Sequence, residues 1–333
     1  MIHRSPSTIA LLTLTVSMLA FGQTAKPQTA KPFAAPRTAD GHPDLEGTWT
    51  NATLTPLERP AALANKPTLT AAEAAAFEKR AIETFNIDRR GGGAEADVAR
   101  AYNNLFIDRG DKLAEVDGTF RTSLIIDPPD GKVPPLTPEG RKRVAARMER
   151  LAHFDSAEDR PLGERCLMGF GSTGGPPMMP VLYNNNYQIV ETPAAVMIMV
   201  EMVHDIRVIH LDRQEHLPAS IREWMGDSIG HWEGDTLVVD TTNFTDKTMF
   251  RGASENLHVV ERFTRTAPNT ILYRFTIDDS SAFTRSWTAE YPFLAAPGPI
   301  YEYACQEGNY ALQDILAGAR AKDKEAEAAK KSK

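Results

Sequence analysis

The sequence predicts a mainly β fold, an antiparallel meander that curls into a barrel or a sandwich, with an N-terminal part of two helices and long loops. From residue 187 onward, apolar and polar residues alternate with a period of two, which is typical of strands with one buried face. Turn-forming residues such as Thr192-Pro193-Ala194 and Gly234-Asp235 separate these segments at short intervals. Strands do not alternate with helices there, so a doubly wound parallel sheet is not expected.

Eight segments of the second half have strand character, and about eight strands are enough to close a barrel. They are residues 187–192, 196–203, 206–211, 236–244, 257–265, 270–277, 283–293 and 299–305. Because the connections are short, segments that follow one another are expected to pair as antiparallel neighbours.

The first half combines helices with loops. A capping box from Thr70 to Glu73 opens one helix that ends near Phe85. Thr137 caps a second helix, which has proline at its first position and ends near His153. The other expected elements are two strands and a long loop rich in glycine, proline and methionine, at residues 45–50, 119–127 and 163–180.

The N-terminus has the pattern of a secretory signal peptide. A short basic start precedes the apolar run 9–21, and small residues stand at the cleavage positions, so cleavage is expected near Gly22. The run is shorter than the roughly 20 residues of a membrane span, although an uncleaved anchor is the alternative. The mature protein is therefore expected to be periplasmic or secreted and without a membrane span.

These features divide the chain into four parts: a signal peptide (1–22), a linker (23–43), one β-rich domain (44–316) and a charged tail (317–333). Within the domain, residues 44–180 form the mixed helical and loop part and residues 181–316 form the meander.

The two cysteines, Cys166 and Cys305, are expected to form a disulfide, because an exported chain reaches an oxidising compartment. Two separate buried thiols are the alternative. The formal net charge is −7 and no basic patch is visible, so nucleic acid is not an expected partner.

Four charged residues fall on otherwise apolar strand faces: Glu201, Arg207, Glu261 and Arg285. A buried charge without a partner costs several kcal/mol, so these groups are expected either to pair inside the barrel or to line a wet cavity. In the second case they would be the polar contacts of a pocket whose apolar walls include Met199, Phe263, Trp287 and Tyr291. The ligand-binding candidates are Arg207, Trp232, Glu261, Arg285, Trp287 and Tyr291.

Residues 224–244, which contain two tryptophans, a histidine and four acidic residues beside a strand, are the candidate binding or reacting surface. A tight hairpin closed by a tryptophan plug would explain the same residues. Acid/base candidates are Glu201, His210, Asp227 and His231. If His204-Asp205 is a two-residue turn, Glu201 and His210 lie diagonally on one face. No HExxH or paired-cysteine signature is present, and neither a metal nor a cofactor is predicted; a metal held between strand hairpins by His204, His210 and His216 is the alternative.

Two motifs carry a resemblance to known proteins. Residues 226–244 (GDSIGHWEGDTLVVDTTNF) and 301–310 (YEYACQEGNY) resemble a family of exported proteins common in soil bacteria, and the likeness spans roughly residues 44–320. The family has no assigned activity and so implies no catalytic residues. Its members often have histidine in place of Gln306, which argues against a metal or acid/base role there. The Gly47-Thr48-Trp49 opening is similar to that of lipocalin-like barrels.

We therefore expect an exported protein that binds a small, partly apolar molecule. The alternatives are an isomerase, lyase or hydrolase that uses the same cavity, and a structural protein of the cell envelope whose charges only pair with one another.

Overall fold

The computed structural model describes residues 33–88, 93–98, 104–169, 175–248 and 250–331, of which residues 34 onward belong to one compact unit. The predicted signal peptide and residues 23–32 of the predicted linker lie outside the described residues. No helix within them is both long and apolar enough to cross a membrane.

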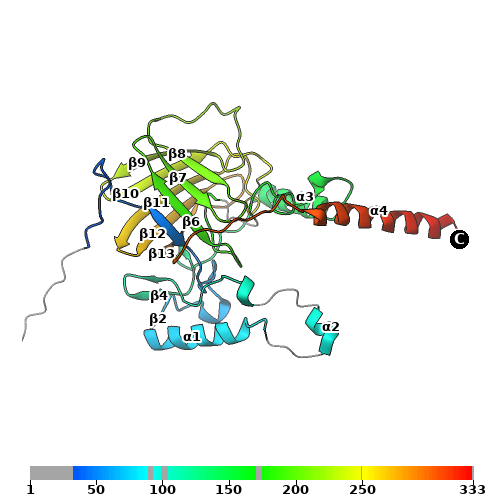
Figure 1. Cartoon of the computed structure of the whole chain (residues 1–333), viewed down its shortest axis with the longest axis horizontal. Coiled ribbons are helices and arrows are strands. Elements are labelled where there is room, and N and C mark those ends of the chain that lie inside the picture. Colours follow the sequence, from blue (N-terminus) through cyan, green and yellow to red (C-terminus); the bar gives the residue numbers. More distant parts are fainter. Residues whose placement is uncertain (1–32, 89–92, 99–103, 170–174, 249, 332–333) are drawn as a thin grey trace, which may run out of the picture. The chain divides into compact units, whose positions relative to one another are not determined.

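Nine strands close into a barrel, which confirms the predicted architecture (Figure 1). They are β1 (Gly47–Thr50), β6 (Asn186–Glu191), β7 (Ala195–Val200), β8 (Ile206–His210), β9 (Asp227–Glu233), β10 (Thr236–Thr242), β11 (His258–Ala267), β12 (Thr270–Asp278) and β13 (Trp287–Ala295). The ring closes at β1, where Trp49 pairs with Tyr187 on one side and with Ala295 on the other.

One pairing departs from the predicted antiparallel meander. β8 and β9 run parallel, with Ile209 opposite Ser228. A parallel pair needs a crossover rather than a hairpin, and residues 211–226 supply it. The tight hairpin of β9 and β10 was predicted from the sequence, but β9 was not among the predicted strands.

The predicted strand at 299–305 is wrong, because this segment has no strand pairing. The predicted strand at 119–127 is two strands, β4 (Thr119–Arg121) and β5 (Ile125–Asp127). β5 pairs with β13, whereas β2 (Thr68–Leu69), β3 (Glu115–Val116) and β4 form a separate three-stranded sheet.

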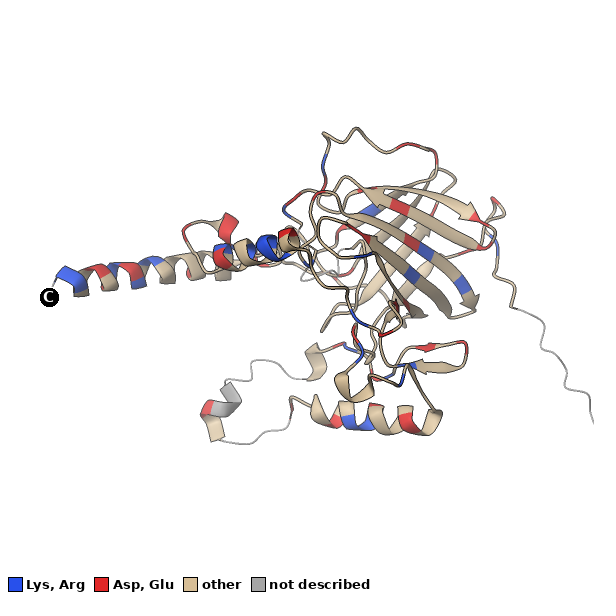
Figure 2. Ribbon diagram, turned by 180° about the vertical axis from the view of Figure 1, so that it is seen from behind, with Lys and Arg blue, Asp and Glu red and all other residues tan. Residues whose placement is uncertain are grey.

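The two predicted helices are confirmed. α1 (Ala71–Thr84) begins at the Thr70–Glu73 capping box, and α3 (Pro138–Leu151) begins at Thr137, whose hydroxyl accepts from the Gly140 amide. α2 (Gly93–Val98) is short. α4 (Tyr310–Lys331) extends the predicted tail toward the N-terminus; it buries no side chain, and acidic and basic residues are mixed along it (Figure 2).

Aromatic side chains fill the barrel interior. Tyr187, Phe263, Tyr273, Phe275, Trp287, Tyr291 and Phe293 are all fully buried. The ring of Tyr273 lies 4.8 Å from that of Phe293 and 5.4 Å from that of Tyr291, measured between ring centres. Each such side chain contributes about 1.5–3 kcal/mol by leaving water, so the interior is the main source of stability.

The loop that precedes β6 is anchored to this interior through Met178. Its amide donates to the Tyr273 hydroxyl at 3.1 Å, and its carbonyl accepts from the Tyr291 hydroxyl and from the Asn51 side-chain amide. The predicted disulfide between Cys166 and Cys305 is present and holds the start of the same loop.

Candidate functional site

The buried charges of the barrel form an ion pair. Arg207 donates to both carboxylate oxygens of Glu261, at 3.1 and 2.6 Å, and the two side chains are 1% and 0% exposed. The Tyr273 hydroxyl donates to Glu261 at 2.7 Å. Burial alone would lower the pKa of Arg207, but the Glu261 carboxylate outweighs it and raises that pKa, so the guanidinium stays charged. This pair agrees with the interpretation in which the interior charges neutralise each other.

Two residues expected on the interior face lie elsewhere. Arg285 precedes β13, is 52% exposed and binds Asp127 at 2.8 Å, so its predicted place beside Trp287 is wrong. Met199 is only partly buried, because Val196, Ile198 and Val200 supply the interior face of β7. The pleat was assigned in the wrong phase for this strand, since both of its faces are apolar in the sequence.

The expected pairing of Glu201 with His210 is also wrong. His210 lies opposite Ala195 in the β7–β8 ladder, because residues 201–205 form a longer turn than the two-residue turn assumed. Glu201 instead accepts from the backbone and side-chain amides of Asn186, at 3.1 and 2.9 Å.

The other candidates are dispersed. His231 is exposed beside Glu233, and the ring of Trp232 stacks on that of His42 with centres 5.1 Å apart. Trp287 and Tyr291 belong to the packed interior, so their ligand-binding role stays a prediction. His210 and Asp227, however, line the same cavity.

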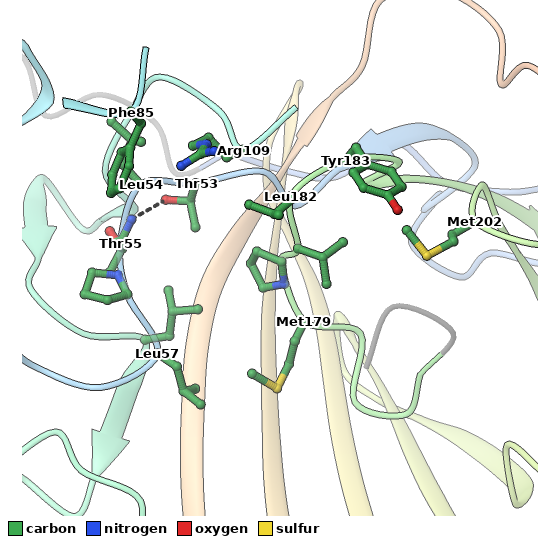
Figure 3. Close-up of a pocket in the computed structure, with 14 residues that line it drawn as sticks. Thr53, Leu54, Thr55, Leu57, Phe85, Arg109, Met179, Leu182, Tyr183 and Met202 are labelled. Atoms are coloured by element: carbon green, nitrogen blue, oxygen red, sulfur yellow. Dashed lines mark hydrogen bonds between the residues drawn. The ribbon is translucent and has the colours of Figure 1, made fainter. Parts of the chain in front are cut away.

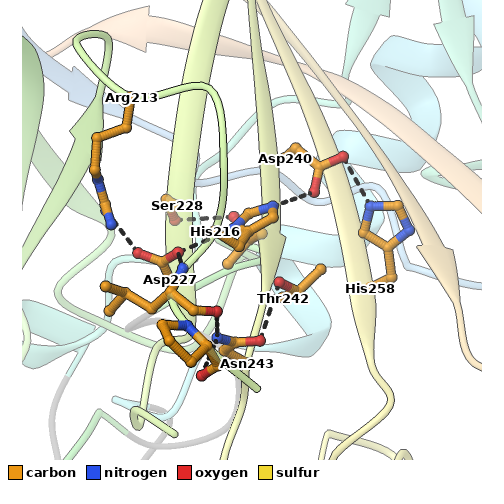
Figure 4. A network of polar contacts seen from close by, with 11 residues as sticks. Arg213, His216, Asp227, Ser228, Asp240, Thr242, Asn243 and His258 are labelled. Atoms are coloured by element: carbon orange, nitrogen blue, oxygen red, sulfur yellow. Dashed lines mark hydrogen bonds and ion pairs between the residues drawn. The ribbon is translucent and has the colours of Figure 1, made fainter. Parts of the chain in front are cut away.

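A polar network surrounds Asp227 on the outer face of β9–β11 (Figure 4). Asp227 accepts from Arg213 at 2.7 Å, from the Leu217 amide at 2.9 Å and from His216 at 3.0 Å. Burial would raise the pKa of Asp227, but these three hydrogen bonds outweigh it and hold the pKa below its ordinary value. All of this ties the β8–β9 crossover to β9.

His216 continues the network to a second carboxylate. Its other ring nitrogen lies 2.9 Å from Asp240, whose second oxygen lies 3.0 Å from His258. His216 thus bridges the two carboxylates through its two ring nitrogens. The hydrogen bond with Asp240 raises the pKa of His258 above its ordinary value. Despite burial, which would raise it, the pKa of Asp240 is lowered by the two histidines.

The crossover also walls a cavity of about 780 Å³, here called the arginine cavity. Its polar wall is formed by Arg207, His210, Arg213, Arg222, Glu223 and Asp227. The arginines have partners already: Arg207 has Glu261, Arg213 has Asp227, and Arg222 binds the carbonyl of Glu255 at 2.7 Å. Few of its charges are left for a ligand.

A second cavity, of about 630 Å³, lies where the segment after β1 meets the segment before β6; it is here called the apolar cavity (Figure 3). Apolar side chains form most of its wall: Leu54, Pro56, Leu57, Phe85, Leu124, Met179, Pro180, Val181, Leu182, Tyr183 and Met202. Thr53, Thr55 and Arg109 complete it. Both volume and lining are typical of sites for small organic molecules, which span about 300–1,000 Å³.

Sequence reasoning missed both the apolar cavity and the network. The segments that supply the apolar cavity are irregular, so no periodicity marks their inward side chains. Asp240 and His258 had a visible signal, because both lie in predicted strands at positions that alternate with buried residues. Neither position indicated that residues 211–226 would place His216 against them.

Within the described part of the chain, no group of three or more histidine, cysteine, aspartate or glutamate residues is arranged to hold a metal ion. The comparisons with known proteins found no matching family model, curated protein or solved structure.

Proposed function

We propose that this is an exported protein that binds a small, partly apolar molecule in the apolar cavity. The observation that carries the proposal is the cavity itself, whose wall is almost entirely apolar. Phe85 and Leu182 on this wall remain 48% and 52% exposed. A cluster of exposed apolar side chains around a concave site loses contact with water when a ligand fills it.

Export is supported by three features. The pattern of residues 1–22 is that of a signal peptide. The Cys166–Cys305 disulfide fits an oxidising compartment such as the periplasm or the exterior. The resemblance to exported soil-bacterial proteins has the same implication.

The neutral probe N-phenyl-1-naphthylamine, which fluoresces in apolar surroundings, tests the site. Wild-type protein is expected to bind it, and Leu54→Trp, which fills the apolar cavity, is expected to bind it much more weakly. Ile206→Trp is the matched control, because Ile206 lines the arginine cavity. Unchanged binding by a folded Leu54→Trp variant would refute the proposal. Native mass spectrometry of protein from its own periplasm then identifies the natural ligand.

Acid/base catalysis is the second candidate function, favoured by the meeting of His210 and Asp227 at the arginine cavity. The hydrogen bonds to Asp227 occupy both its oxygens, which leaves His210 as the available proton carrier. Catalysis would replace binding as the function if the protein changed the mass of its copurified molecule. His210→Gln should then stop this change, and so should Ile206→Trp, which blocks access to the arginine cavity.

A further inference from the structure

The apolar cavity contains one positive charge. Arg109 lines the wall, and its guanidinium carbon lies 4.6 Å from the centre of the Phe85 ring. No carboxylate of the described residues is within ion-pair distance of it. The stacking uses a face of the guanidinium, so the N–H groups at its edge are left for other acceptors.

The neighbouring cation shows that pairing was possible in this region. Lys112, three residues further along, binds Glu78 at 3.1 Å, and Glu78 also accepts from the Leu113 amide. Glu78 is thus committed to the segment before β3, whereas Arg109 lines the cavity.

The two threonine hydroxyls of the wall are already used. The Thr53 hydroxyl donates to the carbonyl of Lys112 and accepts from the Thr55 amide. The Thr55 hydroxyl donates to the carbonyl of Arg121 and accepts from the Ala114 amide. Both threonine hydroxyls are therefore satisfied within the protein, and Arg109 is the charged side chain of the wall, without an ion-pair partner among the described residues.

From this arrangement we infer that the ligand is an amphipathic carboxylate, with an apolar body against the cavity wall and its carboxylate on Arg109; the inference rests on the proposed function. A guanidinium presents paired N–H donors that match the two oxygens of a carboxylate. The apolar surroundings strengthen this contact because they lower the local dielectric constant. A neutral molecule of the same shape would leave the guanidinium facing apolar atoms without an anion.

Displacement of N-phenyl-1-naphthylamine by decanoate and by decan-1-ol tests the inference, because the two compounds share a chain and differ in charge. Wild-type protein is expected to prefer decanoate. A hydrogen bond between charged groups is worth about 1.5–3 kcal/mol, so Arg109→Gln should weaken decanoate about tenfold to a hundredfold and change decanol by less than about twofold. Added salt should reduce the wild-type preference.

Arg80→Gln is the control. Arg80 lies exposed on α1 outside the cavity, and its substitution removes the same charge. It should leave both competitors unchanged. If the probe binds but decanoate and decanol compete equally, or if Arg80→Gln acts as Arg109→Gln does, the carboxylate inference is overturned while the proposed function stands. If wild-type protein does not bind the probe, the proposed function fails as well.

Discussion

Arg207 and Arg109 place the same guanidinium in two different settings. Arg207 is almost completely buried in the barrel and gives both ends of its fork to Glu261. Arg109 is partly buried on the wall of the apolar cavity and contacts the ring of Phe85. The first charge is neutralised within the protein, whereas the second has no ion-pair partner among the described residues and is left for a ligand.

The difference shows where a function is best sought. Burying the charge of Arg207 costs more free energy than placing Arg109 at a cavity wall, and the sequence therefore pointed to the barrel interior as the candidate site. An ion pair whose charges neutralise each other in a packed interior is nevertheless part of the fold. An uncommitted charge beside a cavity is a better indication of ligand binding, because its partner must come from outside.

The largest expected effect is on the barrel pair. Glu261→Ala leaves Arg207 as an unpaired buried charge and should lower the free energy of unfolding by about 3–5 kcal/mol. Denaturant unfolding measures this, with Arg285→Ala as the control, since that exposed pair is worth about 0–1 kcal/mol. Equal effects of the two variants would show that the interior pair is not the structural element described here.

The next effect concerns the loop that contributes to both regions. Met178 enters the barrel interior, and Met179 to Leu182 line the apolar cavity. Replacing Cys166 and Cys305 by serine should lower the free energy of unfolding by about 2–5 kcal/mol, because the disulfide closes a loop of 139 residues. Denaturant unfolding of the oxidised wild type and of the double variant measures this difference in free energy. A difference near zero would mean that other contacts hold the loop.

The network at the crossover should make stability depend on pH. Asp227 and Asp240 have lowered pKa values in the folded protein, so their contribution is present above the unfolded value of about 4 and is lost as pH falls. His258 has a raised pKa, so its contribution is present below about 6.5 and is lost as pH rises through the folded value. Unfolding measured across pH should therefore be flatter in Asp240→Asn. An unchanged profile would argue that the network is not formed in solution.

The smallest expected effect is that of Arg109 on stability. Arg109→Gln should lower the free energy of unfolding by no more than about 1 kcal/mol, because only the stacking on Phe85 is lost and no ion pair with a described residue. A loss comparable to that of Glu261→Ala would place Arg109 with Arg207 as a structural residue and remove the contrast.

The sequence was sufficient for the barrel and for much of its interior. Alternation placed Glu261 beside Phe263, and Arg207 beside Ile209, on inward faces. The Thr70 and Thr137 helix starts followed from local capping chemistry, and the disulfide followed from the oxidising compartment expected for an exported chain. Alternation failed on β7, where both faces are apolar, and at Arg285, which precedes its strand.

The candidate site was less accessible for a physical reason. Its wall combines Leu54, Phe85, Arg109, Met179 and Met202, which come from five separate segments of the chain. None of these residues is unusual within its own segment. Their meeting depends on how irregular segments close over the barrel, and a single sequence contains no periodic signal for that.

The most direct test of the account is a crystal structure of the protein with decanoate. We expect the carboxylate within about 2.7–3.2 Å of the Arg109 guanidinium nitrogens, with the alkyl chain along Leu54, Leu57 and Met179. An alkyl chain inside the barrel, or a carboxylate on Arg213 in the arginine cavity, would contradict it.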